Sequence, residues 1–517
     1  MPPRTFGGMD SDGAVDDVFW GWAVSQGIEA VKCAPSFFNQ GRRGIAAIAD
    51  IEPNEVILKV PGSVLISARS AERDHELKVA LETHGQQLTS AERLACHLLH
   101  EASKGEGSKW HAYIQQLPRN YNLLCSWSEI EIAELQAPYA IDTASRSVQE
   151  MQASHQSAIP TLRIGLSLPS SFTTLRAWQW ARQTISSRTV FVPFDSAGAL
   201  CPVGDLFNYG APEPSINPDV VGSPLGSVME QKMEKNVENT TALEGHAISK
   251  NENIDEIETA HGDGSYDVET DTYCFYARRD YTKNQQIMLC YGKHTNLSLL
   301  EHYGFLLPRS IGNANDNARI EMQTDTEPFV TVDPNGILAW SDLKAVRMLH
   351  VSNSGALKAI YGGLKKARQV IARGESCSPE VELSTFEAVL SSAAKVLTEL
   401  PTTAKDDESA LSEAEKIAED IRTQKHIEAT CQDEQGAPLE WTREVSNVPE
   451  GDAFNLDFDE NNATLAARWR LAYKRAVQAA YRTAHARCDE ARMALGGSRG
   501  TGSVRDVRVS RPRLGTR

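Results

Sequence analysis

The sequence predicts an α+β protein in which short β-sheets with a helical insertion are followed by a mainly α-helical C-terminal domain. Three observations predict this fold class. β-Branched residues bounded by Pro-Asn and Pro-Gly turns fill residues 45–67, which is typical of short strands. Apolar residues recur at helical spacing from about 70 to 187, and the chain is again mainly helical from about 320 onward. Between these regions, strand-like segments lie at 186–194, 200–209, 272–281 and 285–292.

The length and the local composition divide the chain into domains. A chain of 517 residues is too long for one ordinary hydrophobic core, so we expect two ordered domains. The first is predicted over 16–310, with its helical insertion at about 70–187. Within it, residues from about 219 to 268 are acidic, rich in Asn, Gly and Ser, and without apolar periodicity. This segment is predicted to be a disordered loop.

The second domain is predicted over 320–495 and is helical. Residues 384–400 combine a capping box of Ser384 and Glu387 with apolar residues at helical spacing. Another helix is predicted over 463–495, where basic residues flank an apolar stripe and are interpreted as a solvated face. The Arg-, Gly- and Ser-rich segment 496–517 is predicted to be a disordered basic tail.

Charge and cysteine usage narrow the functional classes. The 69 acidic and 52 basic side chains give a net charge of −17, which argues against direct, sequence-independent nucleic-acid binding and favours a basic partner. The nine cysteines are scattered singly and follow no secretory signal, so we expect reduced thiols in a cytoplasmic or nuclear protein. No apolar run approaches the roughly 18 residues of a membrane span, and the acidic N-terminus is unlike a transit peptide.

Three segments carry residues that chemistry could use. The first is GRRG at 41–44, which alone is more typical of a plain hairpin than of a ligand loop and has neither a GxGxxG nor a Walker pattern. The second is VGDLFNYGAPEP at 203–214, whose polar residues could merely satisfy a turn. The third is YARRDYTKNQQIMLCYGKHTNLSLLEHYGF at 276–305, where a tyrosine ends an apolar strand, as core tyrosines also do.

Taken in order, these segments resemble the SET-domain methyltransferases, in the branch that contains the Rubisco large-subunit methyltransferase. The chain supplies GRRGIAAIADIEPNE, SSRTVF, GDLFNY and ARRDYTKNQQIMLCYGKHTNLSLLEHYGF at the positions of that branch's motifs, and the last block is long and specific. The resemblance covers about 16–310, and the later helices resemble the branch's substrate-binding domain more loosely. It implies a SET-type fold, S-adenosyl-L-methionine as cofactor and, since the cysteine cluster of histone-type enzymes is missing, no metal.

The resemblance also implies a role for individual residues. Tyr291 matches the family's catalytic tyrosine, and Arg188 is expected to meet the cofactor's carboxylate. The remaining residues expected to contact the cofactor are Gly41, Arg42, Arg43, Asp205, Leu206, Phe207, Asn208, Tyr209 and Tyr303. Two positions depart from the family pattern. Tyr209 replaces the usual histidine, which puts cofactor affinity in question, and Asn284-Gln285 replaces a Gly-Glu turn.

The resemblance therefore implies a protein-lysine N-methyltransferase, acting as a monomer on a lysine of another protein. Two alternatives stay open. One relative in the branch methylates histidine and is expected to carry an amide two residues beyond the arginine, whereas this chain has the apolar Val190 there. The other alternative is a catalytically inactive SET-like module that binds proteins.

Overall fold

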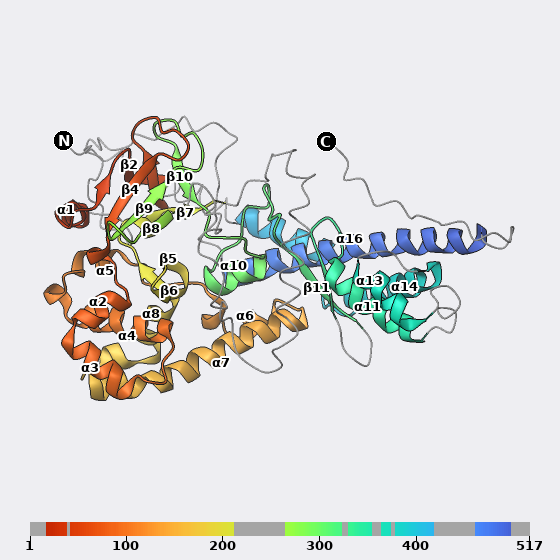
Figure 1. Cartoon of the computed structure of the whole chain (residues 1–517), viewed down its shortest axis with the longest axis horizontal. Coiled ribbons are helices and arrows are strands. Elements are labelled where there is room, and N and C mark those ends of the chain that lie inside the picture. Colours follow the sequence, from red (N-terminus) through yellow and green to blue (C-terminus); the bar gives the residue numbers. More distant parts are fainter. Residues whose placement is uncertain are drawn as a thin grey trace.

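The computed structural model describes residues 17–38, 42–210, 264–322, 329–353, 363–373, 378–417 and 461–497. It shows small β-sheets and a group of helices on one side, and an elongated helical region on the other (Figure 1). The predicted fold class, α+β with a helical C-terminal region, is confirmed.

Two four-stranded sheets follow the first helix, α1 (Asp17–Ser25). The first has the order β1 (Glu29–Ala30), β4 (Val56–Pro61), β9 (Thr272–Tyr276), β8 (Gly264–Asp267). The second has the order β2 (Cys33–Phe38), β3 (Arg42–Ala47), β10 (Gln286–Leu289), β7 (Asn208–Tyr209). Because β10 pairs antiparallel with β3 and parallel with β7, the second sheet brings three segments that are far apart in sequence side by side. These are the three segments that sequence analysis singled out.

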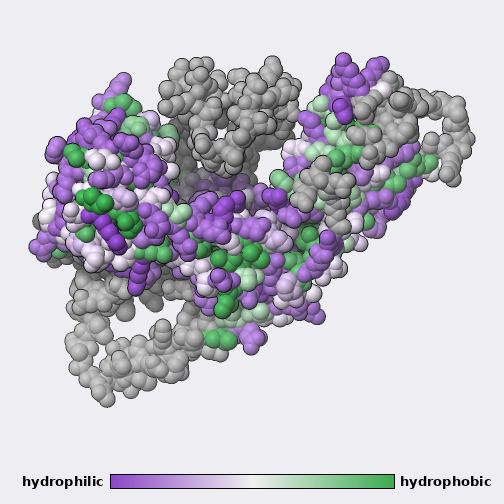
Figure 2. All heavy atoms as spheres, turned by 90° about the horizontal axis from the view of Figure 1, so that it is seen from below, coloured by the Kyte–Doolittle hydropathy of each residue, from purple (hydrophilic) through white to green (hydrophobic). Residues whose placement is uncertain are grey.

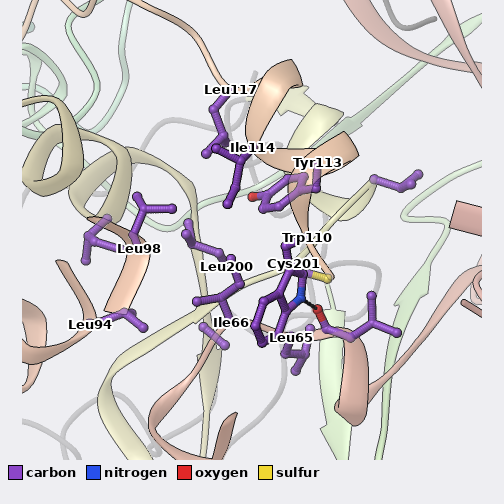
Figure 3. Packing of buried hydrophobic residues seen from close by; sticks show 14 of the residues in the cluster. Leu65, Ile66, Leu94, Leu98, Trp110, Tyr113, Ile114, Leu117, Leu200 and Cys201 are labelled. Carbon is purple, nitrogen blue, oxygen red and sulfur yellow. Dashed lines mark hydrogen bonds between the residues drawn. The ribbon is translucent and has the colours of Figure 1, made fainter. Parts of the chain in front are cut away.

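The helical insertion lies between β4 and a hairpin of β5 (Thr189–Val192) and β6 (Asp195–Leu200). Its helices are α2 (Ala68–Arg73), α3 (His75–His84), α4 (Ser90–Ser103), α5 (His111–Gln116), α6 (Glu129–Ala133), α7 (Pro138–Pro160) and α8 (Leu175–Arg188). Figure 3 shows side chains from α4 and α5 packed with residues of the strands and loops around them. The indole nitrogen of Trp110 donates to the carbonyl oxygen of Val64 at 2.7 Å, so this core is also tied by a buried hydrogen bond.

The remaining elements form the C-terminal region. After α10 (Asn296–His302) come a hairpin of β11 (Ala318–Glu321) and β12 (Phe329–Val332), then α11 (Trp340–Asn353), α13 (Leu364–Ala372), α14 (Pro379–Glu399), a helix over 404–417, and α16 (Asn462–Gly497). Apolar residues of α14, α16 and β11 pack into a second hydrophobic cluster together with Trp127, Leu135 and Ala140 of the insertion. The two regions therefore share a core.

Two predicted boundaries are wrong. Residues 264–267, expected in the disordered loop, form β8, because this segment pairs with β9 and its Tyr266 ring packs edge-on against Phe194 at 5.2 Å. The rest of that loop from 219 to 263 and the tail from 498 lie outside the described residues. Helix α14 begins at Pro379 and not at the capping box, and the hydroxyl of Ser384 instead donates to the carbonyl oxygen of Glu380 within the helix. A proline at the first helical position is itself a strong start signal.

The basic face predicted on 463–495 is also not solvated throughout. Lys474 is 1% exposed, and its ammonium donates to Asp407 at 2.6 Å. Arg470 donates to the other oxygen of Asp407 at 2.8 Å and to Glu134 of the insertion at 2.6 Å. These charges are buried because the helix over 404–417 and the end of α6 both pack on α16. The network joins the C-terminal region to the insertion.

The surface is mainly hydrophilic on the face shown in Figure 2, where hydrophobic residues form small separate groups. None of the described helices combines the length and the apolar composition that crossing a bilayer requires.

We predict that Asp407→Ala lowers the free energy of unfolding by about 3 to 5 kcal/mol, because it leaves the buried Lys474 without its counter-ion and Arg470 with Glu134 alone. The matched control is Glu408→Ala, whose carboxylate meets Arg475 at 2.6 Å at the surface and should contribute less than about 1 kcal/mol. Denaturant titration of both variants measures this difference, and similar losses would contradict a buried network.

Candidate active site

A cavity of about 350 Å³ lies where the insertion meets the second sheet. This volume is within the range of small-molecule sites. Its walls come from the loop after α5, the end of α8, the segment leading into β7, and the residues that follow β10 and α10. The lining residues are Pro118, Asn120, Tyr121, Asn122, Ser187, Arg188, Asp205, Phe207, Asn208, Tyr209, Tyr291, Tyr303, Gly304 and Phe305.

Seven of the residues predicted from the sequence line this cavity. They are Arg188, Asp205, Phe207, Asn208, Tyr209, Tyr291 and Tyr303. Leu206 is buried in the hydrophobic core, and Arg43 lies on β3 without lining the cavity. The backbone of Arg42 belongs to β3, and its side chain lies outside the described part of the structure. Gly41 lies outside the described residues. The roles that the resemblance assigns to these residues stay predictions.

Arg188 and Asp205 form the charged end of the cavity. One terminal nitrogen of Arg188 donates to the carbonyl oxygen of Asp205 at 3.0 Å and to its Oδ2 at 3.2 Å. Asp205 Oδ1 and Arg188 Nε are buried and have no hydrogen-bond partner among the described residues. The pair therefore retains one acceptor and one donor. Buried polar atoms are normally satisfied, so this pair has unused capacity for a ligand.

The turn that carries Asp205 is strained. Val203, a β-branched residue, has φ of 69° and precedes the short helix η7 (Gly204–Leu206). A Cβ on Gly204 would come within 2.5 Å of the Phe275 ring, so only glycine fits there. The local sequence therefore places Asp205 through a left-handed residue and a close approach.

Tyrosine hydroxyls dominate the opposite wall. The Tyr291 hydroxyl donates to the carbonyl oxygen of Phe207, and the Tyr291 ring lies 5.4 Å from that of Tyr303. Burial raises the pKa of Tyr303 to about 12 and moves the pKa of Tyr291 above its usual range. Both are therefore neutral phenols at physiological pH. A neutral phenol that donates to a carbonyl still offers its oxygen lone pairs as an acceptor.

The GRRG segment reaches the cavity through Asn208. The side-chain amide of Asn208 donates to the carbonyl oxygen of Arg43 at 2.9 Å. The guanidinium of Arg43 turns away and donates to the carbonyl of Gln116 at 2.9 Å. A Cβ on Gly44 would lie 3.0 Å from the Asn208 amide, so this glycine permits the close approach. Within the described part of the segment, its contact with the cavity is thus indirect.

Tyr209 is buried, with 1% of its surface exposed. Its hydroxyl donates to the carbonyl oxygen of Gly292 at 3.1 Å, and its ring lies 5.3 Å from that of Tyr291. Tyr209, which stands where the resemblance leads us to expect a histidine, therefore supports the strand end that carries Tyr291, besides lining the cavity.

Sequence reasoning missed the wall formed by the loop after α5. Tyr121 and Asn122 lie there, and the Tyr121 hydroxyl shares a hydrogen bond with Thr184 at 2.9 Å. The Pro- and Asn-rich string PRNYN at 118–122 marks a turn between helices, but nothing in it indicates that the turn faces β7.

One group of potential metal ligands exists among the described residues, formed by Asp74, His100 and Glu101. The ammonium of Lys104 lies 2.7 Å from Asp74 Oδ2 and 2.6 Å from Glu101 Oε1. Because the ammonium of Lys104 already pairs with both carboxylates, this group forms an ion-pair network.

We predict that Gly304→Ala destabilises the protein by about 1 to 3 kcal/mol more than Gly312→Ala. Both glycines have positive φ, 76° and 68°, so both variants carry similar backbone strain. Only at Gly304 would the new Cβ come within 2.9 Å of a backbone atom, that of Asn122 in the cavity wall, whereas Gly312 has open space. Thermal unfolding of the two variants compares them, and equal melting temperatures would show that the wall can move freely.

This chain is similar in sequence to several known proteins. No protein-family model matches the sequence. The chain is 29% identical over 509 residues to Protein SET DOMAIN GROUP 40 of Arabidopsis thaliana, covering 91% of this chain and 95% of that protein. It is 24% identical over 323 residues to the actin-histidine N-methyltransferase of Homo sapiens, covering 60% of this chain and 46% of that protein.

Solved structures of Rubisco LSMT have a similar fold. Rubisco LSMT bound to AdoMet superposes with a TM-score of 0.60 at 16% identity, covering 95% of this chain and 97% of that one. The SET domain of LSMT bound to lysine and AdoHcy also gives 0.60, at 18% identity and 92% coverage of each. The chain therefore shares the fold of Rubisco LSMT and is similar in sequence, over most of its length, to SET DOMAIN GROUP 40.

Proposed function

We propose that this protein is an S-adenosylmethionine-dependent protein-lysine N-methyltransferase. The observation that carries the proposal is that one cavity is lined both by the ion pair of Arg188 and Asp205 and by the neutral phenol of Tyr291. The ion pair has the two charges needed to bind the carboxylate and the ammonium of an amino acid. The SET fold and the related LSMT structures, solved with AdoMet, AdoHcy or sinefungin, support this choice of cofactor.

The residues of the cavity fit the cofactor. Its methionine part carries a carboxylate and an ammonium on one carbon, and the cavity-lining pair offers Arg188 Nε as a donor and Asp205 Oδ1 as an acceptor. An arginine suits a planar carboxylate, and a carboxylate oxygen suits an ammonium. Phe207, Tyr209 and Phe305 supply the apolar and aromatic surface that an adenine requires. When bound, the sulfonium supplies the methyl group.

Tyr291 is then the residue that orients the acceptor amine. Its proton is held by the carbonyl oxygen of Phe207, so its oxygen can accept a hydrogen bond from a substrate N–H. A lysine amine has a free pKa of about 10.4 and must be deprotonated before it can attack, which an apolar, water-poor channel favours. Most of the acceleration comes from holding the amine in line with the methyl group.

Lysine is the preferred acceptor because Val190, two residues beyond Arg188, offers no amide to orient an imidazole. The actin-histidine N-methyltransferases among the relatives make histidine the second candidate. The helices from 320 to 495 would hold the protein substrate, as expected from the resemblance.

Incubation with a cell extract and S-adenosylmethionine carrying a labelled methyl group tests the proposal. We expect a labelled protein band, and mass spectrometry of its peptides should place the label on a lysine side chain. A label on histidine would select the second candidate, and no protein label in extracts of the source organism would favour the inactive binding module.

We predict that Tyr291→Phe lowers kcat strongly while leaving cofactor affinity and melting temperature nearly unchanged, because only the hydroxyl is lost. The matched control is Tyr281→Phe, which removes a buried hydroxyl that faces the carbonyl of Met288 and does not line the cavity. Steady-state kinetics of both variants measure this, and an unchanged kcat in Tyr291→Phe would remove Tyr291 from the mechanism.

We also predict different effects at two neighbouring positions. Asn208→Ala should weaken S-adenosylmethionine binding roughly five- to a hundredfold, because it leaves the Arg43 carbonyl without its donor and loosens the cavity wall. Tyr209→His should preserve binding, because a planar ring that can donate a hydrogen bond remains. Dissociation constants decide this, and the reverse order of effects would show that Asn208 does not shape the cofactor site.

A further inference from the structure

Tyr113 on α5 is tied to the charged end of the cavity without lining it. Its side chain is buried, with 1% of the residue exposed, and packs in the core shown in Figure 3. Its hydroxyl donates to Asp205 Oδ2 at 3.0 Å. Burial and the nearby Asp205 charge raise the pKa of Tyr113 well above its usual range, so the hydroxyl keeps its proton.

Asp205 Oδ2 thus accepts two hydrogen bonds, one from Tyr113 and one from a terminal nitrogen of Arg188 at 3.2 Å. Asp205 Oδ1 accepts none from the described residues, and Arg188 Nε donates none to them. This is unusual for a buried arginine and carboxylate, which commonly form two parallel hydrogen bonds. Such a two-pronged pair would use both carboxylate oxygens and a second guanidinium nitrogen, leaving little capacity for a ligand.

We propose that Tyr113 is a positioning residue for the amino-acid part of the cofactor. By holding Asp205 Oδ2, it fixes the carboxylate in a one-pronged contact with Arg188. Oδ1 of Asp205 then stays available for the ligand's ammonium, and Nε of Arg188 for its carboxylate. This inference rests on the proposed function, since it concerns the same cavity.

The test compares two ligands, S-adenosylmethionine and 5′-methylthioadenosine, which keeps the nucleoside and the sulfur but lacks the amino acid. Isothermal titration measures both for the full chain and for Tyr113→Phe, which keeps the ring in the core. We expect S-adenosylmethionine to bind roughly five- to a hundredfold more weakly to the variant, and 5′-methylthioadenosine to bind equally well to both proteins.

The matched control is Tyr473→Phe, which removes another buried hydroxyl, bonded to the carbonyl of Arg319 at 3.2 Å, in the C-terminal region. It should change neither affinity. An equal loss for both ligands in Tyr113→Phe would indicate general damage to the cavity and overturn the positioning role, as would an unchanged affinity for S-adenosylmethionine. If the wild-type chain itself does not bind S-adenosylmethionine, the proposed function fails first.

A crystal structure of the wild-type protein with S-adenosylmethionine needs no variant. We expect Tyr113 on one oxygen of Asp205 and the ligand's ammonium on the other. A two-pronged pair of Arg188 and Asp205 in that structure would overturn the proposal.

Discussion

The contact between Arg188 and Asp205 is the interaction on which the candidate site depends. Arg188 ends the last helix of the insertion, and Asp205 lies in the turn that leads into β7, so the pair fixes the insertion to the second sheet. A buried charge needs a partner of opposite sign. The packing of α8 against the turn before β7 brings Arg188 and Asp205 together. The cavity is the space that remains beside the pair, and its aromatic wall is carried by residues that follow β10 and α10.

Much of this site was predictable from the sequence because its motifs are local. The segment from 276 to 305 specifies a turn, a strand and a helix in direct succession, and Arg188 and Asp205 stand next to recognisable strand-like segments. By contrast, the contribution of Tyr121 and the Tyr113 hydrogen bond depend on how α5 and the loop after it pack against β7. No spacing in the chain encodes such a distance.

The C-terminal region shows the same limit. The apolar stripe of α16 was visible in the sequence, but periodicity assigns basic residues to the solvent side by default. Lys474 and Arg470 are buried because Asp407 and Glu134, which are distant in sequence, lie against the same helix. Likewise, the strand-forming character of Gly264–Asp267 is weak by itself and becomes clear only through its pairing with β9. In both cases, contacts with residues distant in sequence determined the local structure.

The central claim is that the charge pair recognises the amino-acid part of S-adenosylmethionine. The most direct measurement is calorimetric titration of the wild-type chain with S-adenosylmethionine and with its decarboxylated form, which lacks only the group assigned to Arg188. The account predicts one-to-one binding of S-adenosylmethionine and much weaker binding of the decarboxylated form. Equal affinities, or no heat of binding with S-adenosylmethionine, would contradict it.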